Sequence, residues 1–199
     1  MRCADSGLLV ELDSLREVQG LHGALADDPP AGVADLVPAA RTLLLQLEPG
    51  ADPAAVERAV RDVSAGSAQP RDGGLLRVPV VYDGEDLAAV AELTGLTERE
   101  VVDAHTSAQW TVAFGGFAPG FGYLTGDAPQ LTVPRRAESR TRVPAGAVGL
   151  AGEFSGIYPR ESPGGWQLIG RTDLEIWRLD RDPPALLRPG VRVRFEEAR

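Results

Sequence analysis

The residues best suited to chemistry lie between His105 and Thr172, a third of the chain that holds 12 of the 23 glycines and 8 of the 11 aromatic residues. Within it, four arginines fall inside eight residues. Guanidinium groups repel one another unless an anion or solvent intervenes, and their forked donors match carboxylates and phosphates. We therefore expect an anion or a partner to bind there, although a solvated basic loop or pairing with distant acids would also explain the pattern. The candidate residues are Arg135, Arg136, Arg140, Arg142 and Arg171.

Two glycine- and aromatic-rich segments flank this arginine cluster, GGFAPGFGYL at 115–124 and GIYPRESPGGWQLIGRT at 156–172. Glycines allow close backbone approach, and aromatic rings can wall a pocket. A tight loop packed by its own rings is an equally good explanation. The GxGxxG spacing of a dinucleotide-binding loop is absent. The predicted pocket wall comprises Gly116, Phe117, Pro119, Gly120, Phe121, Tyr123, Tyr158, Pro163, Gly164, Gly165 and Trp166.

Groups that could transfer a proton or attack a substrate are few. No GxSxG elbow surrounds Ser162, so a serine in a turn is the better interpretation. His105 is the candidate acid or base, but its place at the end of a predicted helix is better explained by a favourable interaction with the negative end of the helix dipole. One cysteine, two distant histidines and scattered acids do not resemble a metal site. Lysine is absent, which excludes a P-loop lysine and a Schiff base.

Charge is distributed unevenly along the 199 residues. The formal charge is −9, which argues against general binding to nucleic acid or anionic membranes. Residues 1–104 carry a net −11, whereas residues 105–172 carry a net +2, so the candidate site is a basic island in an acidic protein. The sequence begins without a secretory signal, and it has no apolar run of membrane-spanning length. We therefore expect a cytoplasmic protein.

The elements that must position these residues fall into two groups. Residues 7–13 predict a strand, and Asp13 or Ser14 can cap a helix with an apolar stripe from Leu15 to Leu25. Two short strands, 33–37 and 42–47, precede a helix opened by the dipeptide at 52–53. This βαββα order predicts helices packed on one face of a small antiparallel sheet, with residues 1–74 forming a small α+β domain that ends in a linker at 64–74.

Residues 75–199 change character along their length. A strand at 76–82 and helices at 86–94 and 97–107 are expected first, the second helix opened by a capping-box pattern at Thr97 and Glu100. Five β-prone runs separated by Gly and Pro then predict a small barrel or sandwich. These runs are 110–114, 148–151, 166–171, 175–179 and 191–195.

Four segments in this order carry a family resemblance: GGFAPGFGYL, VPRRAESRTRVPAGAVGLAG, GIYPRESPGGWQLIGRT and DPPALLRPGVRVRF. They resemble the family variously called allophanate hydrolase subunit 1, the B subunit of 5-oxoprolinase, or the KipI-type inhibitor of a sporulation histidine kinase. The segments at 11–25 and 32–50 resemble the first domain of that family, so the resemblance covers nearly the whole chain. It implies an α+β fold in which the small βαββα domain precedes a cyclophilin-like β-barrel domain at 75–199.

The resemblance also implies a function. It implies a non-autonomous component, inactive alone, of an ATP-dependent 5-oxoprolinase that opens 5-oxoproline to glutamate. The partners would be a second, related barrel protein (the C subunit of 5-oxoprolinase, or allophanate hydrolase subunit 2) and a third component that corresponds to the A subunit. ATP would serve as co-substrate of the assembly at a site not recognisable in this sequence. The alternatives are hydrolysis of allophanate and inhibition of a histidine kinase by docking.

Overall fold

The structure is a computed structural model that describes residues 2–3, 6–63 and 73–198. Contacts divide the chain into two compact units, residues 1–71 and 72–199. Most of the predicted linker, residues 64–72, lies outside the described residues. Each unit is described separately below.

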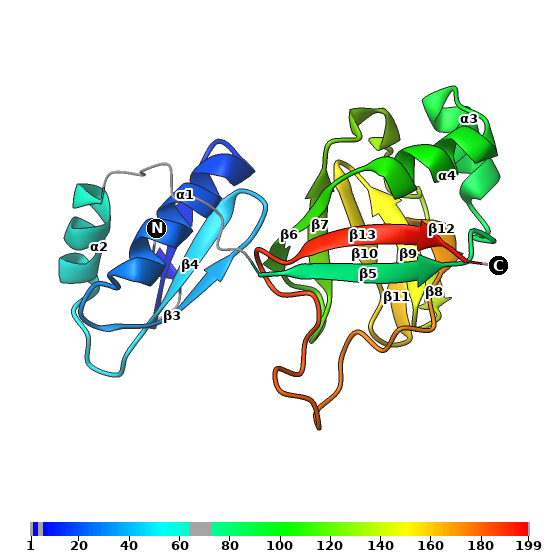
Figure 1. Cartoon of the computed structure of the whole chain (residues 1–199). Coiled ribbons are helices and arrows are strands. Elements are labelled where there is room, and N and C mark those ends of the chain that lie inside the picture. The colour runs from blue at the N-terminus through cyan, green and yellow to red at the C-terminus, as the bar shows by residue number, and fades with distance from the viewer. Residues whose placement is uncertain (1, 4–5, 64–72, 199) are drawn as a thin grey trace. The chain divides into compact units, whose positions relative to one another are not determined.

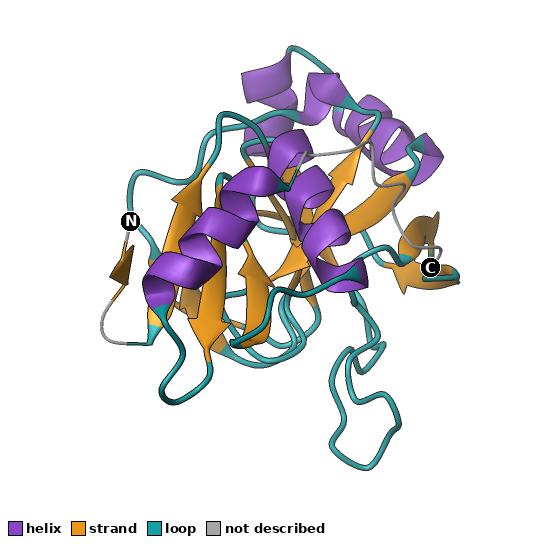
Figure 2. Cartoon of the chain, turned by 90° about the vertical axis from the view of Figure 1, so that its left-hand side faces the viewer, coloured by secondary structure: helices purple, strands orange, loops and turns teal. Residues whose placement is uncertain are grey.

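The first unit is a four-stranded antiparallel sheet with two helices. The strands lie in the order β1-β2-β4-β3, and β1 precedes the predicted βαββα series as an additional edge strand. Figure 2 shows both helices on one face of the sheet, and their apolar residues share one core with alternate residues of β4. The bounds are β1 Arg2–Cys3, β2 Gly7–Glu11, α1 Leu15–Asp27, β3 Val33–Pro38, β4 Thr42–Leu47 and α2 Pro53–Asp62.

Local capping explains where these two helices begin. The Ser14 hydroxyl accepts a hydrogen bond from the backbone N–H of Glu17, which satisfies a donor that the first turn of α1 leaves free. Asp52 caps α2 in the same way through the N–H of Ala54, and Pro53 occupies the first helical position. Both predicted starts are therefore confirmed, with Ser14 rather than Asp13 as the cap of α1.

The second unit is a mixed α/β structure built on a seven-stranded, nearly closed barrel-like sheet. Its strand order is β12-β9-β10-β7-β6-β13-β5. All neighbours are antiparallel except β13 and β5, which lie side by side and parallel in Figure 1. The strands are β5 Leu75–Val80, β6 Trp110–Gly115, β7 Gly122–Gly126, β9 Ala147–Ala151, β10 Phe154–Ile157, β12 Gln167–Arg171 and β13 Arg192–Glu197.

The two ends of this sheet approach each other beyond β5. Val81 and Arg171 exchange two backbone hydrogen bonds of 2.9 Å, which join the end of β5 to β12. A short ribbon of β8 (Arg140–Val143) and β11 (Ser162–Gly164) is attached to the barrel, as are α3 (Leu87–Thr94), α4 (Glu98–Ser107) and a 3-10 turn at Pro129–Leu131. The capping box predicted at Thr97 and Glu100 is present at the start of α4.

The predicted strand at 175–179 is wrong. These residues lie in the long loop between β12 and β13, which extends from the barrel in Figure 1, and form only one isolated bridge, from Trp177 to Ala185. Single apolar side chains of this loop, such as Ile176, are buried in the barrel core, whereas Leu179 is 87% exposed. The adjacent Pro183 and Pro184 lack the N–H donors that a ladder needs.

The sequence did not predict strand β7, because it begins and ends with glycine. A Cβ on Gly122 would lie 2.8 Å from the Cβ of Leu187, and one on Gly126 would lie 2.7 Å from a ring carbon of Trp110. Glycine is thus required at both ends of this strand because neighbouring side chains occupy the space. The same residues suppress the β-propensity signal that would have predicted it.

Candidate functional site

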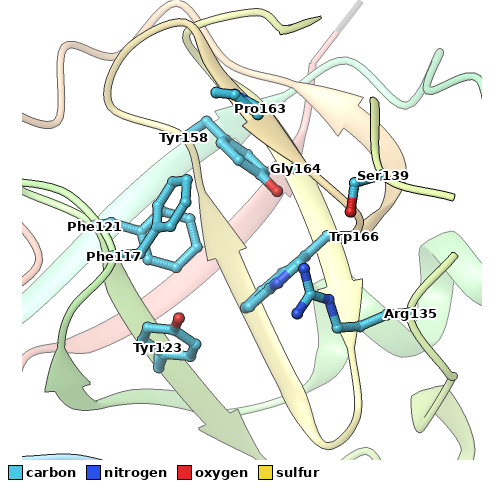
Figure 3. A pocket seen from close by; sticks show the side chains of 9 residues that line it. All are labelled: Phe117, Phe121, Tyr123, Arg135, Ser139, Tyr158, Pro163, Gly164 and Trp166. Atoms are coloured by element: carbon cyan, nitrogen blue, oxygen red, sulfur yellow. The ribbon is translucent and has the colours of Figure 1, made fainter. Parts of the chain in front are cut away.

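A pocket of about 180 Å³ opens beside the ends of β7, β10 and β11 in the second unit. Figure 3 shows aromatic rings around one side of it and the Arg135 guanidinium with the Ser139 hydroxyl on the other. Aromatic walls with a few convergent polar groups are typical of small-molecule sites. The lining residues are Phe117, Phe121, Tyr123, Arg135, Ser139, Tyr158, Pro163, Gly164 and Trp166.

The turn between β6 and β7 holds Phe117 at the pocket in an uncommon conformation. Phe117 has a φ of +66°, and the N–H of Ala118 donates to the carbonyl of Gly116 at 2.7 Å. This three-residue turn with positive φ is strained for any residue except glycine. The Phe117 ring packs edge-to-face on Phe121 and Tyr158, and the residue is 57% exposed. Strain of this kind persists only where surrounding contacts hold it.

Glycine makes room for the rings that form the pocket. A Cβ on Gly156 would lie 2.9 Å from a ring carbon of Phe121 and 3.0 Å from one of Trp166. A Cβ on Gly164 would lie 2.3 Å from the Tyr158 hydroxyl oxygen. The glycine-rich composition of this region therefore has a packing cause: two strands carry glycine where large rings lie against the backbone.

The rings hold one another in a rigid wall. Phe121 meets Trp166 edge-to-face with ring centroids 5.3 Å apart, and meets Tyr158 in the same way at 5.4 Å. Tyr123 contacts Phe121 and Trp166 at 5.1 and 5.5 Å. Edge-to-face pairs at these separations are favourable beyond the burial of area alone. Burial also raises the pKa of the Tyr123 and Tyr158 hydroxyls, which therefore remain neutral hydrogen-bonding groups.

The structure brings one of the five candidate arginines, Arg135, into the pocket lining. Arg142 pairs with Glu161 at 2.6 Å, and Arg171 pairs with Asp83 at 3.0 Å, both on the surface. Arg136 and Arg140 both donate to Asp86. The arginine cluster is therefore divided between structural ion pairs and the pocket.

Asp86, which no local sequence pattern indicates, is the buried partner of two of these arginines. It precedes α3 and is 3% exposed, and its Oδ1 accepts from Arg136 at 2.5 Å and from Arg140 at 2.8 Å. Its Oδ2 accepts from the backbone N–H of Leu168 at 2.7 Å. Burial raises the pKa of Asp86, but the hydrogen bonds from Arg140 and Leu168 outweigh burial and lower it. This buried carboxylate ties the arginine segment to the barrel.

His105 lies in the core and is not among the residues lining the pocket. Its Nδ1 is 2.7 Å from the Tyr82 hydroxyl, and its Nε2 is 2.9 Å from the Ser155 hydroxyl. The ring also stacks on Phe195 with centroids 4.2 Å apart. Burial lowers the pKa of His105 to about 3, so the ring is neutral near pH 7. These contacts favour a structural role over acid or base catalysis.

Seven predicted wall residues line the pocket, and four others lie beside it without lining it. The four are Gly116, Pro119, Gly120 and Gly165. Gly120 serves packing, because a Cβ there would lie 2.7 Å from the Cβ of Trp177. Ser139 was missed: its only sequence signal is its place between the arginines of the cluster.

Two features are absent from residues 2–3, 6–63 and 73–198. No group of three or more His, Cys, Asp or Glu residues in these ranges could hold a metal ion. No helix in the same ranges combines the length and apolar character needed to cross a membrane.

Most of the sequence matches known proteins. A family model described as the carboxyltransferase domain, subdomain C and D, matches residues 1–187. The B subunit of 5-oxoprolinase from Escherichia coli O157:H7 is 42% identical over 191 residues, which cover 94% of this chain and 87% of that protein. The corresponding B subunit from Bacillus subtilis (strain 168) is 45% identical over 124 residues, 61% of this chain and 52% of that protein. The urea amidolyase of Saccharomyces cerevisiae is 32% identical over 118 residues, 53% of this chain but 6% of that protein.

Solved structures extend the comparison to the fold. TTHA0988 superposes with a TM-score of 0.80 at 37% identity over 98% of this chain and 40% of its own. The K. lactis urea amidolyase superposes with a TM-score of 0.76 over 99% of this chain and 14% of its own, and at 20% identity this shows a shared fold alone. The chain thus spans most of the E. coli relative but less than half of these two solved chains.

Proposed function

The chain belongs to the family of the carboxyltransferase domain, subdomain C and D, and from this premise we propose that it is one subunit of an ATP-dependent 5-oxoprolinase. In the proposed reaction, one water adds to the ring amide of 5-oxoproline, the amide C–N bond breaks and glutamate is released, while a second water is consumed as ATP is hydrolysed to ADP and phosphate. The observation that carries the proposal is the 42% identity to the B subunit of E. coli 5-oxoprolinase over 94% of this chain.

The pocket of the second unit is the proposed seat of the substrate ring. Its rings offer flat apolar surface to the ring of 5-oxoproline, and Arg135 offers a cation to its carboxylate. Of the described residues, the nine that line the pocket include no carboxylate and no histidine. A pocket that binds but lacks a general base supports a site completed by another subunit, and hence a chain that is inactive alone.

ATP does not fit this pocket. Binding of a nucleoside triphosphate needs several cations or a cradle of backbone N–H groups, whereas this pocket is lined by one arginine. Its volume of about 180 Å³ is also small for such a ligand. We therefore place ATP, the proposed co-substrate, on another component of the assembly. The proposed partners, in the cytoplasm, are a related barrel protein that corresponds to the C subunit of 5-oxoprolinase and a third component that corresponds to its A subunit.

We also propose a domain organisation that follows the family resemblance. We assign residues 1–74 to the small α+β domain with its linker and residues 75–199 to a cyclophilin-like barrel domain. The barrel-like sheet with its attached helices supports this assignment. Prolyl isomerase activity does not follow from such a likeness, because a fold does not specify a function.

Reconstitution tests the proposal. The chain alone, the partner subunits alone and the full mixture are each incubated with 5-oxoproline and ATP, and glutamate release is measured. We expect glutamate only from the full mixture. Release that is the same with and without this chain would contradict the proposal.

A second candidate is supported by the urea amidolyase relatives, which are 32% identical over about half of this chain. In this candidate function the chain acts as allophanate hydrolase subunit 1, the first alternative that the family resemblance implies. Ammonia release from allophanate by this chain with its barrel partner, without turnover of 5-oxoproline, would favour it. Inhibition of a histidine kinase remains a prediction from the family resemblance.

A further inference from the structure

Arg135 differs from the other four candidate arginines in its electrostatic surroundings. Each of the others forms an ion pair of 2.5–3.0 Å with Asp86, Glu161 or Asp83. Within the described part of the chain, Arg135 has no such carboxylate partner, and it lines the aromatic pocket. Arg135 is exposed, so its unpaired guanidinium beside the aromatic rings is open to an anion that enters the pocket.

Ser139 shares this corner of the pocket because residue 165 has no side chain. A Cβ on Gly165 would lie 2.8 Å from the Ser139 Oγ and 3.3 Å from an Arg135 guanidinium nitrogen. Glycine at 165 therefore lets both polar groups lie close to the backbone of the turn between β11 and β12. Figure 3 shows the hydroxyl and the guanidinium on the same side of the cavity, opposite the phenylalanines. Together they offer a charged and a neutral donor, which suits a carboxylate.

The segment that carries these two groups is anchored at both ends. The N–H of Arg136 donates to the carbonyl of Gly165 at 2.8 Å, and its guanidinium donates to Asp86. Arg140, one residue after Ser139, donates to the same carboxylate. Asp86 thus anchors the segment at the residue that follows each of the two polar donors. Such anchoring reduces the entropy lost when a ligand binds.

The opposite wall is held at a cost in backbone strain. Phe117 keeps a positive φ while its ring packs on Phe121 and Tyr158 at the pocket. A glycine would relieve the strain, but it would remove the ring from the wall. Strained residues of this kind cluster at ligand-binding and active sites.

Size and charge define the ligand class. The pocket of about 180 Å³ is smaller than the ~300 Å³ at which sites for drug-sized molecules begin. One unpaired cation matches one carboxylate and is too little for a polyphosphate. We propose that Arg135 and Ser139 form the carboxylate-binding end of a pocket for a small, flat, singly charged acid. The naming of this acid as 5-oxoproline rests on the proposed function.

Nuclear magnetic resonance of the full ¹⁵N-labelled chain tests the proposal directly. The probes are 5-oxoproline, 5-oxoprolinamide, pyrrole-2-carboxylate and ATP, and the signals are the Trp166 indole N–H and the Gly164 and Gly165 amides. We expect the carboxylates to shift these signals, and we expect the uncharged carboxamide to bind about ten- to a hundredfold more weakly. ATP should leave the signals in place.

Variants assign the effect to one side chain. Arg135→Gln should weaken 5-oxoproline binding about ten- to a hundredfold, and Arg135→Lys should restore part of the loss. The matched control is Arg188→Gln, since Arg188 is exposed and lies outside the pocket lining. It should bind like the wild type. Equal binding of acid and carboxamide, or wild-type binding by Arg135→Gln, would overturn the proposal, as would failure of both carboxylates to shift the signals.

The same data separate the subsite from the proposed enzyme. If pyrrole-2-carboxylate binds in an Arg135-dependent way and 5-oxoproline does not, the subsite stands and the proposed substrate fails. If the assembly hydrolyses 5-oxoproline and Arg135→Gln leaves its KM unchanged, the enzyme stands and the subsite fails.

Discussion

Asp86 and Arg140 form a largely buried ion pair in the second unit: the carboxylate is 3% exposed and accepts from the Arg140 guanidinium at 2.8 Å. The same carboxylate accepts from Arg136, so one acid fixes two members of the arginine cluster. Their neighbour Arg135 is left for the pocket. The pairing of Asp86 with Arg140 thus explains how a cluster of like charges is both stable and available for binding.

Removal of the Asp86 charge should destabilise the second unit. Asp86→Asn removes the buried counter-charge of the largely buried Arg140 guanidinium and leaves it only the exposed Glu85 at 3.1 Å, so we expect a loss of about 3 kcal/mol in the free energy of unfolding. Urea unfolding followed by tryptophan emission measures this loss, because Trp110, Trp166 and Trp177 all lie in residues 72–199. The control, Asp83→Asn, breaks an exposed pair and should cost less than about 1 kcal/mol. Equal losses of stability in Asp86→Asn and Asp83→Asn would contradict a stabilising role for the buried ion pair.

The buried His105 should make the second unit less stable in acid. Its pKa is lowered from 6.5 to about 3 by burial, so between these values the unfolded chain binds one more proton than the folded chain. Stability from this group is complete above about pH 6.5 and falls by about 1.4 kcal/mol per pH unit below it, until about pH 3.

His105→Gln removes the titrating group and should flatten the dependence of stability on pH in that window, whatever its effect on stability at pH 7. Urea midpoints from pH 4 to about pH 7, read from tryptophan emission, give the slope. An unchanged slope in His105→Gln would show that the buried ring is not the source.

Phe117 allows the backbone strain to be measured. Phe117→Gly and Phe117→Ala both remove the ring, but only glycine adopts a φ of +66° without a steric cost. We therefore expect the glycine variant to be more stable than the alanine variant by about 1 kcal/mol in urea unfolding. Both should weaken ligand binding, because both lack the ring. An alanine variant as stable as the glycine variant would indicate that the turn is not strained.

Gly156 should tolerate no larger residue. In Gly156→Ala the new Cβ would lie 2.9 Å from Phe121 and 3.0 Å from Trp166, so the rings that form the pocket must shift. We expect a loss of about 1–3 kcal/mol in stability and an altered near-ultraviolet circular dichroism spectrum. In the control, Gly115→Ala, the Cβ has one neighbour at 3.8 Å, an ordinary contact. A wild-type spectrum for Gly156→Ala would contradict the packing described here.

Features governed by neighbouring residues were predictable from the sequence. The capping box of Thr97 and Glu100, the Asp52 cap and the strands β3 and β4 depend on residues a few positions apart, and all are present. The aromatic wall was also predictable, because the rings cluster in the sequence as they do in space. Local composition was a sufficient signal in each case.

Features governed by distant residues were not predictable in this way. Asp86 is separated from Arg140 by 54 positions, and nothing near it in the sequence indicates that it neutralises the arginine cluster. The sequence places His105 at a helix end but does not indicate the contacts with Tyr82, Ser155 and Phe195 that enclose it. The ion pair of Asp86 and the burial of His105 depend on how the barrel brings distant segments together, which the pattern of neighbouring residues does not reveal.

The central claim is that Arg135 binds the carboxylate of the substrate in an assembled 5-oxoprolinase, and steady-state kinetics of the reconstituted assembly test it most directly. The assembly is prepared with wild-type chain, Arg135→Gln or Arg188→Gln, and the KM values for 5-oxoproline and for ATP are measured separately. We predict that Arg135→Gln raises the KM for 5-oxoproline about tenfold or more and changes the KM for ATP by less than about twofold, while Arg188→Gln matches the wild type. An unchanged KM for 5-oxoproline in Arg135→Gln, or an equal rise in both KM values, would contradict the claim.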